Sequence, residues 1–433
     1  MYPDFQYLLQ SLTGRAMPEW LSIFKTFGFF VALAFIAAAW TSTIELKRKE
    51  KLGILRPTFR TIEMGKPVTS LELVLSALVG FILGYKIGGL FSNWAIVGPN
   101  PLGYVFSLQG NFLVGLAGAL LLGISKYSEK KKQQLAEPVT KQVAVYPHQL
   151  MSEFVVVAAI GGLIGAKVFN AFETWDQFIK DPIGSLLSSS GLTFYGGLIV
   201  AASIFYYYAR RHKIPFSQLC DSIAPGLMLA YGIGRFGCHF AGDGDWGIFN
   251  SAYITRPDTT LAVSTGKDYM SALHTGMGYF QSNFGSIGNV PSAHFLAPSW
   301  LPRWSVAMNY AHNVNNEGIP IVGCIGRYCS VLPVSVFPTS LYEALTCIGL
   351  FFVLWSLRGK LFRPYHMFGA YLILNGVERF IIEKIRVNYK YNWGFIHPTQ
   401  AEIISTIFII AGLSILLFYR KNSKQATVQL SDE

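Results

Sequence analysis

The side chains that could do chemistry gather in one stretch of the chain, YGIGRFGCHFAGDGDWG, at residues 231–247. It follows an apolar segment and carries an arginine, a thiol, an imidazole and two carboxylates: Arg235, Cys238, His239, Asp243 and Asp245. An arginine at the edge of a bilayer is costly without a partner, so it usually marks a substrate or ion path. Glycine backbone N–H groups beside a guanidinium suit a phosphate. The stretch therefore predicts chemistry on a charged lipid head group.

The composition indicates a membrane protein. Of the 433 residues, 52% are hydrophobic and 14% are charged, against about a quarter charged in a typical soluble domain. The net charge of +11 comes from short basic runs between apolar segments, at 47–51, 130–132, 210–213, 358–363 and 420–421. Runs of this kind are typical of cytoplasmic loops, so we exclude nucleic acid as a partner.

Nine segments are long and apolar enough to cross a bilayer, which predicts an all-α polytopic membrane protein. The expected spans are 20–42, 71–92, 110–126, 152–172, 193–208, 217–236, 335–356, 366–385 and 400–419. Placing every basic run in the cytoplasm puts the N-terminus outside and the C-terminus inside. We see no cleaved signal peptide in the first twenty residues, because a basic leader region is missing.

This span assignment divides the chain into six regions. We expect an N-terminal arm with the first span, a basic loop with an extra hairpin, core helices with the arginine motif, a large extracytoplasmic loop, C-terminal core helices and a cytoplasmic tail. Their bounds are 1–42, 43–150, 151–247, 248–334, 335–420 and 421–433.

The extra hairpin looks like a duplicate of the one that follows it. At a shift of 81 residues, Gly84-Tyr85-Lys86 aligns with Gly165-Ala166-Lys167, and Pro101-Leu102-Gly103 aligns with Pro182-Ile183-Gly184. Gly110 and Gly115 then align with Gly191 and Gly196. Four matches in one register predict a repeated helical hairpin, although small residues also recur in unrelated membrane helices. The polar residues lie in the second copy, so we interpret the first as scaffold.

The five cysteines predict no metal site, because no pair has metal-ligand spacing. Cys324 and Cys329 lie in one polar loop and could form a short disulfide in an oxidising compartment. Cys238 is more typical of a small packed residue than of a nucleophile.

The motif resembles that of the prolipoprotein diacylglyceryl transferase family of bacterial membrane enzymes. Further segments match that family in order: Gly165-Ala166-Lys167, Tyr195-Gly196-Gly197-Leu198, Asp221-Ser222-Ile223-Ala224-Pro225, Phe337-Pro338-Thr339-Ser340-Leu341-Tyr342-Glu343, and Arg379-Phe380-Ile381-Ile382-Glu383. The resemblance covers about 150–410. It implies transfer of a diacylglyceryl group from phosphatidylglycerol to the lipobox cysteine of a prolipoprotein, in the bacterial inner membrane and without a cofactor. It also implies a seven-helix core, which the extra hairpin would extend to nine.

Several positions depart from the family pattern. Tyr195 stands where relatives have histidine, Cys238-His239 where they have asparagine, and Lys167 where they have arginine. Either Asp243 or Asp245 replaces the family glutamate. These changes affect the identity of the base more than that of the substrate.

The expected site residues fall into two overlapping groups. The catalytic group is His239, Tyr195, Arg235, Arg379 and Glu383, and the head-group binding residues are Arg235, Gly237, Cys238, Asp243, Asp245, Gly247, Arg379 and Lys167. A guanidinium binds phosphate oxygens in a bidentate manner, and an imidazole titrates near neutral pH. Structural alternatives stay open: a snorkelling Arg235, an Arg379–Glu383 ion pair at i, i+4, and an interfacial His239.

Two other functions remain open on the sequence alone. Duplicated hairpins and glycine-broken spans also occur in transporters, but there the ionisable residues lie at mid-bilayer. A catalytically silent relative would explain the departures at Tyr195 and Cys238. The loop 248–334 is expected to act as an extracytoplasmic lid or as a rest for the incoming lipoprotein segment.

Overall fold

The computed structural model describes residues 1–92, 104, 107–135, 139–187, 191, 193–361, 363–388, 390–392, 394 and 396–429. The chain is mostly helical, and a helix lies on each of the nine expected spans. Six helical segments of the described residues are long and apolar enough to cross a membrane: Thr26–Lys51, Ser70–Ser92, Phe112–Gln133, Pro147–Glu173, Thr339–Leu357 and Gln400–Phe418. The expectation of a polytopic membrane protein is therefore confirmed.

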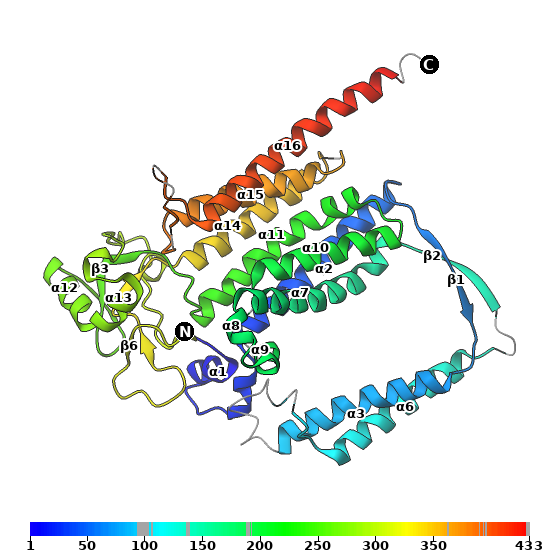
Figure 1. The fold of residues 1–433 in the computed structure, drawn as a ribbon, viewed down its shortest axis with the longest axis horizontal. Helices are drawn as coiled ribbons and strands as arrows, with labels where there is room; N and C mark the ends of the chain where they lie inside the picture. The colour runs from blue at the N-terminus through cyan, green and yellow to red at the C-terminus, as the bar shows by residue number, and fades with distance from the viewer. Residues whose placement is uncertain are drawn as a thin grey trace. The chain divides into compact units, whose positions relative to one another are not determined.

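The chain divides into two compact units, residues 1–45 with 217–433 and residues 46–216. The second unit contains the two hairpins and two strands (Figure 1). Its elements are β1 (Thr58–Met64), α3 (Ser70–Ser92), α6 (Phe112–Gln133), β2 (Val139–Val145), η2 (Pro147–Leu150), α7 (Met151–Glu173), α8 (Trp175–Phe178), α9 (Pro182–Leu187) and α10 (Phe194–Arg211).

The element bounds bear out the predicted repeat. Helices α3 and α7 are both 23 residues long and begin 81 residues apart, at Ser70 and Met151. The seven-residue strands β1 and β2 are also 81 residues apart, and they pair with each other in an antiparallel ribbon. The matched Pro101-Leu102-Gly103 segment lies outside the described residues.

Glycines set the close helix packing inside each hairpin. A side chain on Gly84 would collide with the carbonyl group of Val114, and a Cβ on the equivalent Gly165 would lie 2.6 Å from the carbonyl oxygen of Gly196. Only glycine allows two backbones to approach this closely, as in other small-residue contacts between membrane helices. In both copies an equivalent glycine thus meets the backbone of the partner helix, at carbonyl groups one residue apart in the repeat.

The first unit contains the remaining long helices. They are α2 (Thr26–Lys51, which ends in the second unit), α11 (Phe216–Ala241), α14 (Thr339–Leu357), α15 (His366–Glu383) and α16 (Gln400–Gln429). In Figure 1, α14 lies beside α15, and α15 lies beside α16. Gly232 lets α11 approach α14, since a Cβ there would lie 2.9 Å from the carbonyl oxygen of Ala344.

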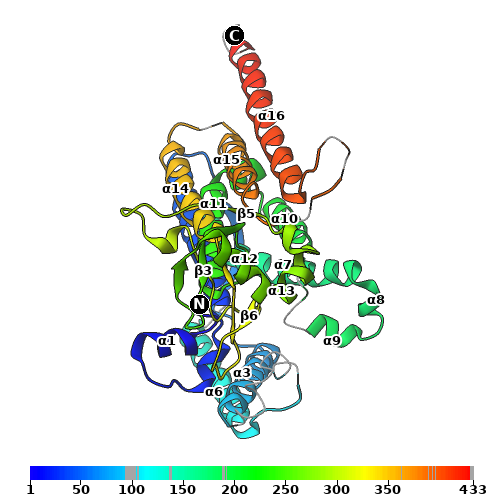
Figure 2. The same ribbon diagram turned by 90° about the vertical axis from the view of Figure 1, so that its left-hand side faces the viewer.

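Residues 249–336 fold into a head with its own small sheet, which the sequence did not predict (Figure 2). Strand β3 (Phe249–Thr255) pairs with β4 (Leu261–Val263), β5 (Ser292–Ala293) and β8 (Val334–Val336). The other elements are α12 (Gly266–Thr275), α13 (Met277–Phe284), η3 (Ile287–Asn289), η4 (Arg303–Ser305), β6 (Ile319–Pro320) and β7 (Ser330–Val331). Its core contains the buried aromatic residues Phe249, Phe280 and Tyr310, and Trp246 from the preceding loop packs into it.

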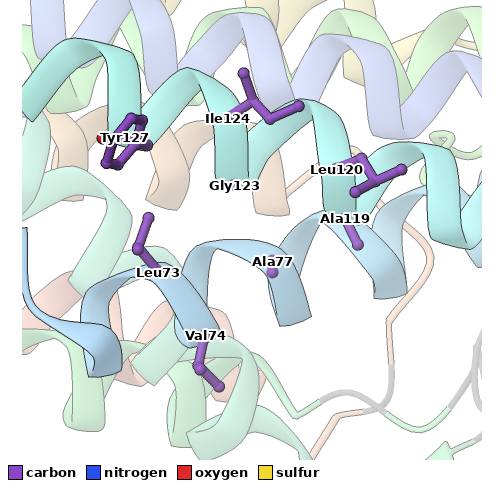
Figure 3. A pocket seen from close by; sticks show the side chains of 8 residues that line it. All are labelled: Leu73, Val74, Ala77, Ala119, Leu120, Gly123, Ile124 and Tyr127. Carbon is purple, nitrogen blue, oxygen red and sulfur yellow. The ribbon is translucent and has the colours of Figure 1, made fainter. Parts of the chain in front are cut away.

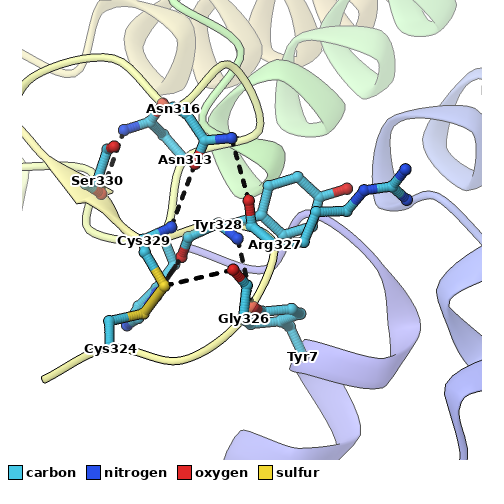
Figure 4. Close-up of a disulfide and its surroundings, with 10 residues drawn as sticks. Tyr7, Asn313, Asn316, Cys324, Gly326, Arg327, Tyr328, Cys329 and Ser330 are labelled. Atoms are coloured by element: carbon cyan, nitrogen blue, oxygen red, sulfur yellow. Dashed lines mark hydrogen bonds between the residues drawn. A yellow bond between two sulfur atoms is a disulfide. The ribbon is translucent and has the colours of Figure 1, made fainter. Parts of the chain in front are cut away.

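The N-terminal arm packs against the tip of this head. It consists of α1 (Phe5–Thr13) and η1 (Glu19–Ile23). Cys324 and Cys329 form a disulfide, as the sequence suggested, and the loop that they close contacts Tyr7 of the arm (Figure 4). The rings of Tyr7 and Tyr328 meet edge to face at 5.4 Å.

Candidate functional site

Arg235, near the end of α11, lies between two carboxylates. Its Nη1 donates a short hydrogen bond to Asp245, and its Nε lies 2.5 Å from Oε2 of Glu343 on α14. Its Nη2 donates to the Tyr231 hydroxyl at 3.3 Å, and the guanidinium covers the Tyr231 ring. The arginine is therefore held on three sides and is not a loosely snorkelling side chain.

Two more arginines converge on the same carboxylates. Nη1 of Arg379 donates to Oε1 of Glu343 at 2.5 Å, and Arg386 donates to the same oxygen at 3.3 Å. Arg386 also forms a short ion pair with Asp245. The predicted pair of Arg379 with Glu383 is present, with Nη2 to Oε2 at 3.1 Å. Glu343 thus bridges three guanidinium groups.

The cluster has balanced charges and an incomplete set of hydrogen bonds. Three arginines face three carboxylates, those of Asp245, Glu343 and Glu383. Both glutamates are fully buried, whereas 29% of the Asp245 side chain is exposed. Nε of Arg386 is buried and has no hydrogen-bond partner among the described residues. An orphaned guanidinium donor beside an accessible edge is what an anionic ligand would satisfy.

Buried capping bonds fix the helices that carry the cluster. Asp221 on α11 accepts hydrogen bonds from the backbone N–H groups of Tyr365 and Phe368, at 2.8 and 2.9 Å, at the start of α15. Thr339, in the first turn of α14, donates to the backbone carbonyl of Asp245 at 2.9 Å. An acceptor at a helix N-terminus satisfies otherwise unpaired N–H groups. The family-like segment around Asp221 therefore sets the position of α15 and its arginine.

The loop after α11 turns sharply at Gly242. This residue adopts φ +69°, and its N–H donates to the carbonyl oxygen of Cys238 at 3.0 Å. A left-handed residue commonly ends a helix, and glycine adopts that conformation without strain. The turn brings the acidic residues of the loop back toward Arg235.

The two aspartates of this loop have opposite electrostatic environments. Burial and the neighbouring Asp245 raise the pKa of Asp243 to about 6. Burial also raises the pKa of Asp245, but the guanidinium groups of Arg235 and Arg386 outweigh this and hold it below its ordinary value. Of the two candidates, Asp245 is therefore the carboxylate that belongs to the arginine cluster.

His239 points into the base of the head. It is only 7% exposed, and its Nδ1 lies 3.2 Å from the hydroxyl group of Tyr310. The Tyr310 hydroxyl lies 3.5 Å from Oγ of Ser340, and burial raises the pKa of this tyrosine. The neutral hydroxyl can thus hydrogen-bond the imidazole on one side and Ser340 on the other.

The remaining motif positions have packing contacts. Cys238 is buried, and its sulfur lies 4.0 Å from Nη1 of Arg235. A Cβ on Gly237 would lie 3.0 Å from the side chain of Phe30. The N–H of Gly247 donates to the carbonyl oxygen of Phe337 at 2.8 Å, so it is not free for a phosphate in this structure.

Two expected site residues, Lys167 and Tyr195, belong to the other compact unit. Nζ of Lys167 donates to the carbonyl oxygen of Ser185 at 3.3 Å. The repeat-equivalent Lys86 makes the same contact, at 2.9 Å, with Tyr104, which is the equivalent of Ser185. A shared loop contact in both copies supports a structural role for this lysine. Tyr195 lies in the first turn of α10 and is half-buried.

The described residues contain no group of three or more histidine, cysteine or acidic side chains that could hold a metal ion.

A family model described as prolipoprotein diacylglyceryl transferase matches residues 112–418. The chain belongs to this family. The match covers the whole arginine cluster and begins at α6, so α1, α2 and α3 lie before it.

Curated relatives carry the name phosphatidylglycerol--prolipoprotein diacylglyceryl transferase. The protein of Xanthomonas oryzae pv. oryzae is 29% identical over 270 residues, which are 60% of this chain and 72% of the relative. The protein of Chlorobaculum tepidum is 26% identical over 353 residues, or 76% of this chain and 93% of the relative. A protein of Leptospira interrogans is 23% identical over 323 residues, or 63% and 80%.

In this family member, sequence reasoning missed the centre of the cluster. The sequence pattern singles out Glu343 only as the last residue of a family-like segment and does not assign Arg386 to the site. A glutamate within an expected span was the available signal, because a buried carboxylate requires cationic partners. Three arginines within reach of that span supply them.

Proposed function

We propose that this membrane protein transfers the diacylglyceryl group of phosphatidylglycerol to the cysteine thiol of a prolipoprotein. The family match and the names of the relatives support the reaction. The single structural observation that carries the proposal is the arginine cluster, with an unsatisfied donor on Arg386 and an accessible edge at Asp245.

The cluster suits the leaving group of this reaction. The thiolate sulfur bonds to the glycerol carbon while the bond from that carbon to the phosphate oxygen breaks, and the electron pair leaves with glycerol-1-phosphate. Negative charge therefore grows on the phosphate in the transition state, where preorganised guanidinium groups stabilise it most. In our proposal Arg235, Arg379 and Arg386 bind that phosphate.

Asp245 occupies the place where an anion would bind. It bridges Arg235 and Arg386 and is the most exposed of the three carboxylates. We propose that the phosphate enters at this edge and shares or replaces the contacts of Asp245. Glu343 and Glu383 are fully buried behind the guanidinium groups and would hold them in position.

The thiol proton needs an acceptor, and His239 remains our candidate, with Tyr195 as a hydrogen-bond donor to the substrate. The hydrogen bond between Nδ1 and Tyr310 would fix the imidazole so that Nε2 faces the substrate. Gly237, Cys238 and Gly247 would then shape the site through packing, and Asp243 would add to its charge.

The finer topology is also part of the proposal. We infer nine spans, because the helices α10, α11 and α15 lie on the other three expected spans. Charged residues interrupt α11 and α15, whereas α10 carries them only in its last turn. The basic runs place the N-terminus outside the bacterial inner membrane and the C-terminus in the cytoplasm. The partners are phosphatidylglycerol, a signal peptide with a lipobox cysteine and membrane lipids, without nucleic acid. The six regions given above remain the proposed domain boundaries.

The proposal is tested with purified protein, labelled phosphatidylglycerol and a lipobox peptide. We expect the wild type to transfer the label and Arg235→Ala to lose at least about 100-fold in rate, as for other charge-stabilising groups. Arg256→Ala is the matched control, since Arg256 is an exposed residue of the head. His239→Ala tests the base.

Each outcome of this assay has a clear reading. The proposal would be supported if the wild type and Arg256→Ala transfer the label and Arg235→Ala does not. No transfer by the wild type, in detergent and in liposomes, would favour a catalytically silent relative. Equal activity of wild type and Arg235→Ala would remove the arginine cluster from the mechanism.

A further inference from the structure

The extra hairpin contains an apolar groove between its two helices. The groove has a volume of about 400 Å³ and is lined by Leu73, Val74, Ala77, Ala119, Leu120, Gly123, Ile124 and Tyr127. In Figure 3, Leu73 extends from α3 toward Tyr127 on α6. Both helices are apolar enough to cross a membrane, and little of either is buried inside the structure. The groove therefore opens toward lipid.

The groove starts where the glycine contact between the helices ends. A side chain on Gly80 would collide with the carbonyl group of Gly118, so the backbones touch at that level. Further toward the start of α3 the helices separate. A Cβ on Gly123 would meet only the Cβ of Ala77, at 3.8 Å. A residue larger than glycine would fit at that position.

The second copy of the hairpin also has close glycine contacts, but larger side chains stand at several positions equivalent to the groove lining. Phe154 and Phe205 are the equivalents of Leu73 and Ile124, and their rings stack at 5.5 Å. Ile204 is the equivalent of Gly123 and packs directly on Gly161. The second copy thus closes with its own side chains a space that the first copy leaves open.

The hydrogen bonds of the polar groups at the end of the groove also differ between the two copies. In the second copy the hydroxyl group of Tyr208 donates a short hydrogen bond to Glu153. In the first copy the equivalent Glu72 pairs instead with Lys130, at 3.4 Å. The hydroxyl group of Tyr127, the equivalent of Tyr208, has no hydrogen bond to any described residue.

Two exposed lysines, Lys131 and Lys132, follow Tyr127 at the end of α6. Nζ of Lys131 lies 5.6 Å from the centre of the Tyr127 ring. Lys131 and Lys132 are exposed, and no ion pair to either is found within the described part of the chain. A hydroxyl donor with the ammonium group of Lys131 near its ring and Lys132 next in the sequence, at the end of an apolar groove, is complementary to a phosphate attached to an acyl chain.

We propose that this groove binds an anionic phospholipid, with an acyl chain along α3 and α6 and the phosphate on Tyr127, Lys131 and Lys132. With the orientation inferred above, this lipid would belong to the cytoplasmic leaflet. The arginine cluster lies in the other compact unit and on other helices, so this site is separate from the one that binds the reacting lipid.

The test is native mass spectrometry of the purified full chain titrated with phosphatidylglycerol, phosphatidylcholine or soluble glycerol-1-phosphate. Lys131→Gln with Lys132→Gln should weaken phosphatidylglycerol binding roughly tenfold and leave phosphatidylcholine binding unchanged. A second variant copies the filled repeat, with Leu73→Phe, Gly123→Ile and Ile124→Phe. It should lose one bound phospholipid.

Matched controls make the same changes elsewhere. Lys47→Gln with Lys51→Gln removes two exposed cations from another basic run, and Leu121→Phe enlarges an exposed residue of α6 outside the groove. Neither should change lipid binding. Glycerol-1-phosphate should not compete at concentrations that saturate the lipid, because it lacks the acyl chain.

Several results would overturn the proposal. These are equal binding of the two phospholipids, unchanged binding by both groove variants, or an altered oligomeric mass, which would make another protein helix the occupant. The transfer assay separates this test from that of the proposed function. The groove variants should transfer at the wild-type rate, whereas Arg235→Ala should keep its groove lipid.

Discussion

Replacing Glu343 by glutamine tests whether one buried carboxylate holds the arginine cluster together. The change keeps the shape of the side chain and removes one negative charge. Glu343 is fully buried and lies within 2.5 Å of both Arg235 and Arg379 and 3.3 Å from Arg386. After the change, three guanidinium groups would face only two carboxylates in a poorly solvated place.

The expected cost follows from that geometry. Removing one partner from a buried ion pair typically destabilises a protein by about 3–5 kcal/mol, because the remaining charge is left uncompensated. For a chain of this length we expect the thermal midpoint to fall by roughly 5 °C or more. Transfer should also fall, since Arg235 and Arg379 lose the group that orients them.

A second buried glutamate provides the control. Glu378 on α15 is only 4% exposed, but neither of its carboxyl oxygens has a hydrogen-bond partner among the described residues. The charges of Glu343, Arg379 and Arg235 act on it from a distance, and the thiol of Cys347 lies beside it. An unpaired buried carboxyl is expected to be neutral, so Glu378→Gln should change stability by less than about 1 kcal/mol.

The assay is thermal unfolding of both variants in the same detergent, followed by size-exclusion recovery, together with the transfer rate. A large loss for Glu343→Gln beside a small one for Glu378→Gln is the expected result. Equal losses, or a stable and active Glu343→Gln, would refute the claim that the carboxylate bridges and orients the guanidinium groups.

Three further predictions concern the surroundings of the cluster. Arg235→Lys should not restore the transfer rate of Arg235→Ala, because an ammonium group cannot bind two carboxylates and a phosphate in the planar geometry of guanidinium. Asp243→Asn should stabilise the protein at pH 7 by about 1–2 kcal/mol and leave it unchanged at pH 4. Folding raises the pKa of Asp243 from 3.8 to about 6, so the folded protein loses stability as pH increases through that window. The full shift corresponds to about 3 kcal/mol, which solvent screening reduces. An equal gain in the free energy of unfolding at pH 7 and at pH 4 would contradict this prediction. Cys324→Ser with Cys329→Ser should lower stability by up to about 2 kcal/mol, because the closed loop is short, and reductant should then have no further effect on the variant.

Local patterns were enough to predict the helices and part of the site. Each expected span carries a helix, and the i, i+4 spacing of Arg379 and Glu383 gives the ion pair that it predicted. The glycine and lysine matches predicted the repeat. These features depend on neighbours within one or two helical turns, or on direct comparison of two stretches of sequence.

Long-range contacts were not accessible in this way. Strand β3 pairs with β8 more than seventy residues later, and neither has a pattern that identifies its partner. The cluster around Glu343 joins three helices and two loops, so no single window of sequence contains it. The choice of Asp245 over Asp243 likewise depends on the turn at Gly242.

The antiparallel ribbon formed by β1 and β2 is symmetric with respect to the repeat, and this symmetry bears on the origin of the duplicated hairpin. Thr61 lies opposite Gln142, and these two residues occupy the same position in the two copies. Because equivalent strands pair symmetrically around this position, one such strand could also pair with a copy of itself in another molecule. The same symmetry holds at the isologous interface of a homodimer. A chain with a single copy would expose that strand edge to a second molecule. We therefore expect a version shortened by one 81-residue period to associate in pairs through this strand, and gene duplication would have turned that contact between molecules into one within a single chain.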